Sequence, residues 1–86
     1  MQRLILVVED DPGMAALYAA LFVHDRIVVV TSARDALEAL ERERPTLMIL
    51  DVTLHGSHAA DVVRGMDGAW PPIVVVSAES NADLFA

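Results

Sequence analysis

Acidic and hydroxyl side chains follow three short apolar runs of this 86-residue sequence. Glu9, Asp10 and Asp11 come directly after the first run, Asp51 follows the third, and Ser77 follows the fourth. Carboxylates about 4 Å apart repel each other by roughly 4 kcal/mol at an effective dielectric of about 20, a cost seldom accepted without a bound cation. Mg²⁺ suits carboxylate oxygens and also binds phosphoryl oxygens. A cation here would prepare Asp51 to attack a phosphoryl group, because it would neutralise charge on that group.

Four apolar runs would bring these side chains together. The runs are residues 4–8, 27–30, 47–50 and 73–76. None of them alternates apolar with polar residues, a pattern typical of strands buried on both faces of a parallel sheet. In doubly wound sheets, ligands bind beyond the carboxyl ends of the strands. The acidic and hydroxyl residues stand at those ends, so we expect them to converge at one edge of the sheet.

Two of the intervening segments carry helical patterns of different width. The segment after the first run has a broad apolar stripe that could dock on a sheet, made of Met14, Leu17, Tyr18, Leu21 and Phe22. Pro12 suits the first turn of this helix. The segment after the third run has a narrower stripe, made of Ala59, Val62, Val63 and Met66. Gly65 and Gly68 favour an end to that helix.

The segment after the second run also predicts a helix. Thr31 or Ser32 could cap its first turn, because either hydroxyl can accept a hydrogen bond from the backbone. Pro45 ends it, and Glu38 and Arg42 have the spacing of an ion pair on the solvent side. Strand and helix therefore alternate along the whole chain. This pattern predicts an α/β fold with a doubly wound parallel sheet, formed by one domain that spans residues 1–86.

Composition excludes several classes of protein. At 55% hydrophobic residues the chain is too apolar to be disordered. Its formal net charge of −7 argues against direct binding to nucleic acid or to an anionic membrane. The absence of cysteine excludes disulfides, thiolate zinc sites and cysteine nucleophiles. The apolar runs are far shorter than the ~20 residues of a membrane span, so we expect a cytoplasmic location by default.

Three motifs resemble those of one family, the receiver domains of two-component response regulators. Residues 4–12, with the sequence LILVVEDDP, resemble the opening strand and acidic pocket of these domains. Residues 48–51, MILD, resemble their phosphorylation strand. Residues 73–78, IVVVSA, are similar to their fourth strand and the small residues after it. The motifs occur in the family's order and cover essentially the whole chain.

The resemblance implies a role for each residue of the acidic edge. Glu9, Asp10 and Asp51 would hold Mg²⁺, together with the backbone carbonyl of Thr53. Asp51 would be the phosphoryl acceptor in a phosphorelay, and the donor would be a histidine kinase or a phosphotransfer protein. Ser77 would hydrogen-bond the phosphoryl group. Such a domain is not an enzyme toward other substrates, since it catalyses only its own phosphoryl transfer and dephosphorylation.

Ala78 completes the implied site, because its small side chain leaves room for the phosphoryl group. The family's fold is a flavodoxin-like sheet, and the strands of this chain would take the order 2-1-3-4. The sequence departs from the family at His55, where proline is common, and it lacks the fifth strand with its lysine and the fifth helix. The strand at 73–76 would then be an edge, and an uncharged edge favours pairing with a second copy of the chain.

Other functions remain open at this level. A receiver-like module that serves only dimerisation or partner docking would also fit the missing last strand. An aspartyl-phosphate hydrolase would need a second acid two residues after its nucleophile, and Thr53 occupies that position. A flavodoxin-like cofactor site would need a glycine-rich loop after the first strand, which the acidic residues replace.

Overall fold

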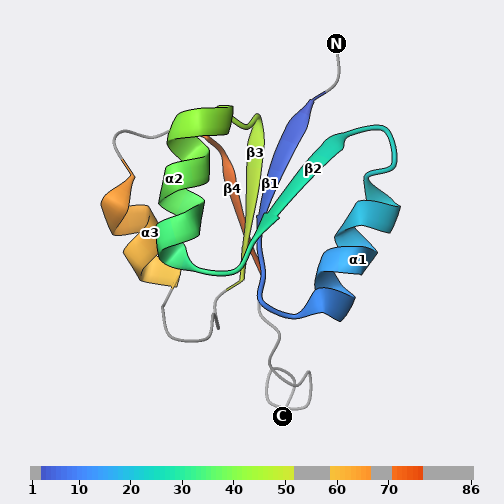
Figure 1. Cartoon of the computed structure of the whole chain (residues 1–86), viewed down its shortest axis with the longest axis horizontal. Helices are drawn as coiled ribbons and strands as arrows, with labels where there is room; N and C mark the ends of the chain where they lie inside the picture. The colour runs from blue at the N-terminus through green and yellow to red at the C-terminus, as the bar shows by residue number, and fades with distance from the viewer. Residues whose placement is uncertain (1–2, 52–58, 67–70, 77–86) are drawn as a thin grey trace.

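The part of the chain that the structure describes forms seven elements that alternate between strand and helix, as the sequence predicts. The structure is a computed structural model of the chain, and it describes residues 3–51, 59–66 and 71–76. The elements are β1 (Leu4–Val8), α1 (Pro12–Leu21), β2 (Arg26–Val30), α2 (Ala33–Glu43), β3 (Leu47–Asp51), α3 (Ala59–Gly65) and β4 (Ile73–Val76) (Figure 1). Among the described residues, no helix has the length and apolar character needed to cross a membrane.

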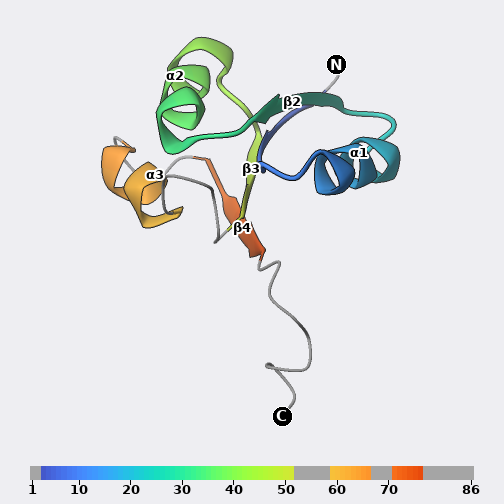
Figure 2. The ribbon, with the colours of Figure 1, turned by 60° about the horizontal axis from the view of Figure 1, so that its bottom comes forward.

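The four strands form one parallel sheet in the order β2-β1-β3-β4. The predicted fold class and strand order are therefore confirmed. Helix α1 covers one face of the sheet, and α2 and α3 cover the other (Figure 2). All four strands point the same way, so their carboxyl ends lie along the same edge.

Each strand contributes to two cores, which explains why its apolar run does not alternate with polar residues. Residues Ile5 and Val7 face α1, and Leu6 and Val8 face α2 and α3. Among the described residues, the core on the α2 and α3 side contains nine that are buried: Leu6, Val8, Ala33, Ala36, Ala39, Leu40, Met48, Leu50 and Val62. The core on the α1 side contains four: Ile5, Val7, Tyr18 and Ile49.

Helix α1 begins as predicted but buries less of its stripe than the pattern suggests. The Asp11 side chain caps it by accepting a hydrogen bond from the Gly13 N–H at 2.8 Å. Tyr18 is its one buried residue. Leu17 is 49% exposed and Leu21 is 65% exposed, so only part of the stripe docks on the described sheet. The described part of the sheet covers only the side of α1 that carries Tyr18 and its partly buried neighbours.

Helix α2 is capped by Ser32, whose hydroxyl accepts a hydrogen bond from the Asp35 N–H at 3.1 Å. The expected ion pair between Glu38 and Arg42 is not the one that forms. Glu38 pairs with Arg34 at 3.5 Å, and Arg42 pairs with its neighbour Glu43 at 3.3 Å. All of these side chains except Glu43 are exposed, and the choice among partners on a helix surface changes the energy very little.

Helices α2 and α3 approach each other closely at one glycine. A Cβ atom built on Gly65 would lie 2.5 Å from Leu37 Cδ1, which is too close for two carbon atoms. Val62, which belongs to the core that Leu37 packs against, is fully buried, whereas Val63, expected in the same stripe, is 50% exposed. Helix α3 is only seven residues long, so one narrow line of its surface meets α2 and the sheet.

Candidate functional site

The sheet places Glu9 and Asp51 side by side. Strands β1 and β3 are parallel neighbours, and Val8 pairs with Leu50 in the register. The residues that follow this pair, Glu9 and Asp51, therefore lie at the same edge of the sheet. Glu9 is also bonded to β2, on the other side of β1, because its N–H donates a hydrogen bond to the Val30 carbonyl at 2.9 Å. Both acidic side chains are buried, with 3% of Glu9 and 4% of Asp51 exposed.

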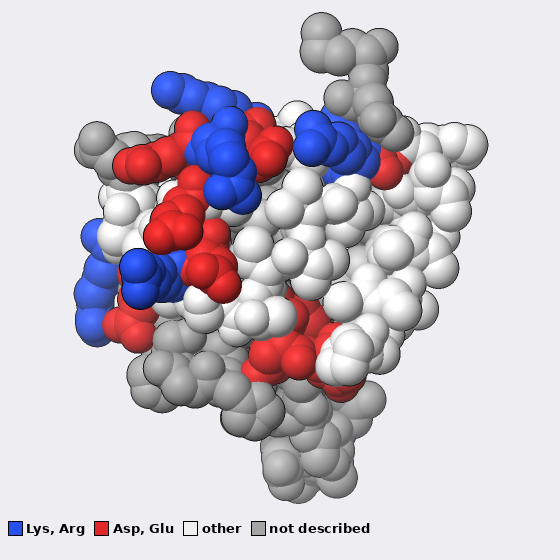
Figure 3. Space-filling model, in the orientation of Figure 1, with Lys and Arg blue, Asp and Glu red and all other residues white. Residues whose placement is uncertain are grey.

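Asp10 joins these two residues at the start of the turn to α1. One ligand oxygen from each of Glu9, Asp10 and Asp51 can be chosen so that all three lie within 4.8 Å of one another. Figure 3 shows acidic side chains gathered at the lower end of the molecule, where the strands of Figure 1 end. Three carboxylates at this separation form a concentrated negative charge.

Burial and repulsion change the protonation of this group. The pKa of Glu9 is raised from its ordinary value of 4.5 to about 7, first because burial removes water from the carboxylate. A hydrogen bond with the Asp51 side chain and the negative charge of Asp51 raise it further. The pKa of Tyr18 is also raised, by burial first and then by the charges of Glu9 and Asp51.

One oxygen of the site is left unsatisfied. Within the described part of the chain, Glu9 Oε2 is the buried side-chain oxygen without a hydrogen-bond partner. A buried carboxylate oxygen normally has a hydrogen-bond partner. A missing hydrogen bond costs about 1–3 kcal/mol, and more for a charged group. Three converging carboxylates with an unsatisfied oxygen fit a hard divalent cation such as Mg²⁺.

The structure brings together three of the residues predicted from sequence and leaves three outside its description. Glu9, Asp10 and Asp51 converge as expected. The Thr53 carbonyl, Ser77 and Ala78 lie outside the described residues, and so does His55; their roles stay predictions.

Sequence reasoning placed one nearby residue in the core and missed its relation to the site. Tyr18 was expected only as part of the apolar stripe of the first helix. Its charge interactions with Glu9 and Asp51 show that its hydroxyl lies within electrostatic reach of the carboxylates. The direction of helical side chains, which lean toward the helix N-terminus, was the signal that could have found it.

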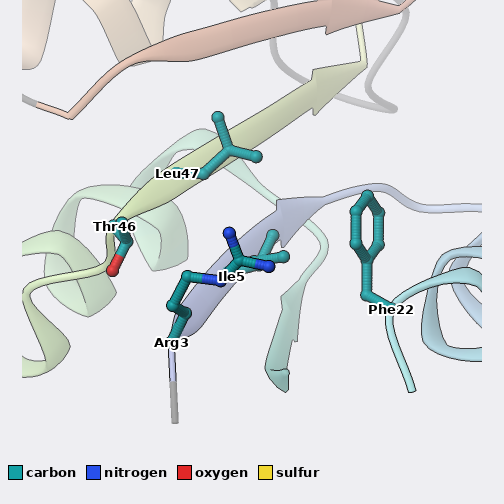
Figure 4. Close-up of a pocket in the computed structure, with 5 residues that line it drawn as sticks. All are labelled: Arg3, Ile5, Phe22, Thr46 and Leu47. Atoms are coloured by element: carbon teal, nitrogen blue, oxygen red, sulfur yellow. The ribbon is translucent and has the colours of Figure 1, made fainter. Parts of the chain in front are cut away.

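A small pocket lies at the opposite edge of the sheet. It has a volume of about 70 Å³ and is lined by Arg3, Ile5, Phe22, Thr46 and Leu47 (Figure 4). Arg3 and Thr46 precede β1 and β3, so this pocket is at the amino ends of the strands. It is therefore separate from the acidic edge.

Comparison with known proteins agrees with this geometry. The chain is 34% identical over 82 residues to the transcriptional regulatory protein RstA of Escherichia coli, covering 93% of this chain and 34% of RstA. It is 32% identical over 84 residues to the DNA-binding response regulator MtrA of Mycolicibacterium smegmatis, covering 94% of this chain and 37% of MtrA. The chain thus spans about a third of the length of these curated relatives.

A solved structure gives the same result for the fold. The BeF3-activated N-terminal receiver domain of RstA from Klebsiella pneumoniae superposes with a TM-score of 0.77 at 33% identity, covering 93% of this chain and 72% of that one. The family described as the response regulator receiver domain matches residues 5–86. A match over nearly the whole chain, together with the parallel sheet and its acidic edge, shows that the chain belongs to the receiver domains of response regulators.

Proposed function

We propose that this receiver domain accepts a phosphoryl group on Asp51 from a histidine kinase or a phosphotransfer protein, in a Mg²⁺-dependent reaction. The observation that carries the proposal is the convergence of Glu9, Asp10 and Asp51 at the carboxyl edge of the sheet. Strand β3 aims Asp51 at this edge and holds it in a buried position. The family's role in two-component signalling supports the same conclusion.

Each acidic residue has a distinct part in this proposal. Glu9, Asp10 and Asp51 would hold Mg²⁺, with the Thr53 carbonyl as a further ligand. Bound Mg²⁺ supplies positive charge that offsets the negative charge of the phosphoryl group. An Asp51 carboxylate oxygen attacks phosphorus in line, so a phosphorus–oxygen bond forms while the phosphorus–nitrogen bond to the donor histidine breaks. The donor imidazole leaves with the bonding electron pair and takes up a proton.

Two residues after β4 would contact the phosphoryl group. Ser77 would donate a hydrogen bond to a phosphoryl oxygen, and Ala78 would leave space beside it. Both assignments come from the resemblance of residues 73–78 to the family's fourth strand. In this role the domain is a signalling module that catalyses only its own phosphorylation and dephosphorylation.

Acetyl phosphate tests the proposal without the unknown donor. The wild-type chain, incubated with acetyl phosphate and Mg²⁺, should gain the mass of one phosphoryl group. Asp51→Asn should gain none, while Glu41→Gln, which removes an exposed carboxylate on α2, should react as the wild type does. Wild-type chain that gains no mass, or Asp51→Asn chain that still gains it, would contradict the proposal.

We also propose that the 86-residue chain associates with itself through β4. In the part of the chain that the structure describes, β4 pairs with β3 alone. An open strand edge without charge favours pairing with another chain. This property would also serve the alternative function, a receiver-like module that docks partners without phosphorylation.

Two lysine substitutions distinguish pairing through the β4 edge from nonspecific association of exposed apolar residues. Val74 on β4 and Val63 on α3 are each 50% exposed, so a lysine at either position can reach water. Val74→Lys should shift a sedimentation profile toward monomer, because charge on an edge strand opposes pairing. Val63→Lys should leave the profile unchanged. A wild-type chain that stays monomeric at high concentration would exclude this association.

The partners of the domain follow from its charge and its relatives. A net charge of −7 makes the domain itself a poor ligand for DNA, so DNA binding as named for MtrA would belong to another part of a longer regulator. We place the domain in the cytoplasm, where a regulator of transcription and its kinase would meet.

A further inference from the structure

Tyr18 is the only tyrosine of the chain, and it occupies an unusual position in the core. It is 9% exposed and is the one buried residue of α1. Its ring belongs to the core on the α1 side, together with Val7 of β1 and Ile49 of β3. A buried tyrosine normally directs its hydroxyl toward a polar partner, because an apolar site would leave that group unsatisfied.

The sheet places the acidic site directly beyond these two members of the core. Side chains two residues apart on a strand share a face, so Glu9 follows Val7 and Asp51 follows Ile49 on the face that α1 covers. The separation along a strand is about 6.6 Å for two residues, which is similar to the length of a tyrosine side chain. The side chain of a tyrosine in the same core as Val7 and Ile49 is therefore long enough to bring its hydroxyl near the carboxylates.

The direction of α1 aims the ring the same way. The helix begins at the acidic edge, because its first residue, Pro12, comes two residues after Asp10 and three after Glu9. Helical side chains lean toward the N-terminus of their helix, so the Tyr18 side chain leans toward that edge. The raised pKa of the Tyr18 phenol, which the negative charges of Glu9 and Asp51 help to cause, agrees with this placement.

The site has a group that such a hydroxyl would satisfy. Glu9 is 3% exposed, and its Oε2 atom has no hydrogen-bond partner among the described residues. A cation held by Glu9, Asp10 and Asp51 would occupy part of the lone-pair capacity of the Glu9 carboxylate. A buried carboxylate has about four lone-pair sites, so further donors are still needed.

We propose that Tyr18 is a positioning residue of the acidic site, whose hydroxyl donates a hydrogen bond to the Glu9 carboxylate through one bridging water molecule. This bond holds the carboxylate in the orientation that binds the cation. The ring packs in the core and the hydroxyl acts at the site, so the two parts of the side chain have separate effects. The inference rests on the proposed function, because it takes the acidic edge to be the Mg²⁺ site.

The variant Tyr18→Phe isolates the hydroxyl, because it keeps the ring and the packing. We expect metal-free Tyr18→Phe to unfold in urea close to the wild-type midpoint. Its Mg²⁺ affinity, measured by calorimetry, should fall about tenfold, which is the size expected for one hydrogen bond to a charged group. Phe22→Leu is the matched control, since Phe22 packs against the same core at the other end of α1. It should lower stability and leave Mg²⁺ affinity unchanged.

A second measurement does not depend on the metal. The carboxyl carbon resonance of Glu9 in metal-free protein should shift in Tyr18→Phe and stay in place in Phe22→Leu. The wild type could fail to bind Mg²⁺ while the Glu9 resonance still shifts in Tyr18→Phe. That result would contradict the Mg²⁺ part of the proposed function and support the contact between Tyr18 and Glu9. A Tyr18→Phe variant with wild-type Mg²⁺ affinity and an unshifted Glu9 resonance would overturn the inference.

Discussion

The carboxyl groups of Glu9 and Asp51 share a hydrogen bond at the ends of two neighbouring parallel strands, and both side chains are almost completely buried. Two carboxyl groups can share a hydrogen bond only when one of them carries a proton. Because the pKa of Glu9 is raised to about 7, the site without metal holds a proton below about pH 7, where a cation would otherwise offset the charge. Proton and metal compete for the same place, and the predictions on pH and Mg²⁺ follow from this competition.

The stability of the metal-free protein should fall as pH rises from about 4.5 to about 7. Across this range folded Glu9 keeps a proton that unfolded Glu9 has lost, because its pKa is raised to about 7. A folded state that binds more protons loses stability with rising pH. The loss is up to roughly 3 kcal/mol for this one group. Urea unfolding of the wild type and of Glu9→Gln across the range checks it, and parallel curves for the two proteins would contradict it.

Mg²⁺ should raise the thermal stability of the wild type, since it relieves repulsion in the folded state and binds the unfolded chain poorly. Asp10→Asn should weaken this effect and yet stabilise the metal-free protein, by removing one negative charge from the cluster. Melting curves with Mg²⁺ and with a chelator measure both quantities. Glu41→Gln serves as the control for loss of a charge elsewhere. If Asp10→Asn matches that control in both conditions, the assignment of Asp10 to the cluster is wrong.

Mutation of the α2 cap should distinguish two adjacent hydroxyls. Ser32→Ala should destabilise the protein by about 1 kcal/mol, because the Asp35 N–H loses its acceptor. Thr31→Ala should change stability by less than about 0.5 kcal/mol, as expected for an exposed position. Chemical denaturation of the two variants is the measurement. Equal losses would show that the first turn of α2 is not capped by Ser32 alone.

Gly65→Ala should destabilise the contact between α2 and α3 by about 1 kcal/mol, because the added methyl group meets Leu37 and overpacks the contact. In a Leu37→Ala background the same change should be neutral or stabilising, since Ala is the better residue in a helix. A double-mutant cycle measured by denaturation gives the coupling between the two positions. Additive effects of the two substitutions would mean that Leu37 moves away without cost.

The sequence predicts the site well because parallel strands impose a simple geometry. Residues that follow β1 and β3 must stand at one edge, so Glu9 and Asp51 could be paired without coordinates. The choice between Thr31 and Ser32 could not be made in this way, because it depends on backbone angles at the turn. The exposure of Leu17 and Leu21 could not be predicted either, because the width of an apolar stripe does not determine how much of it a neighbouring element covers.

The role of Tyr18 illustrates a different limit. A tyrosine at a core position satisfies the apolar pattern of the first helix, so the pattern gives no reason to look further. Its relation to Glu9 depends on how α1 crosses the sheet and where the helix starts. Such relations require the arrangement of elements in space, which the spacing of residues in one segment does not contain.

The two faces of the sheet also differ in how firmly they hold their helices. Among the described residues, α2 and α3 contribute five buried residues to the core on their face, whereas Tyr18 is the one buried residue that α1 contributes to the core on the other face. Elements with few buried contacts open locally at lower free energy than the rest of a domain. The amide hydrogens of α1 should therefore exchange with solvent before those of β1 and β3. A cation held by Glu9, to which Tyr18 is bonded, would slow this exchange, so binding at the acidic edge would protect the amides of α1.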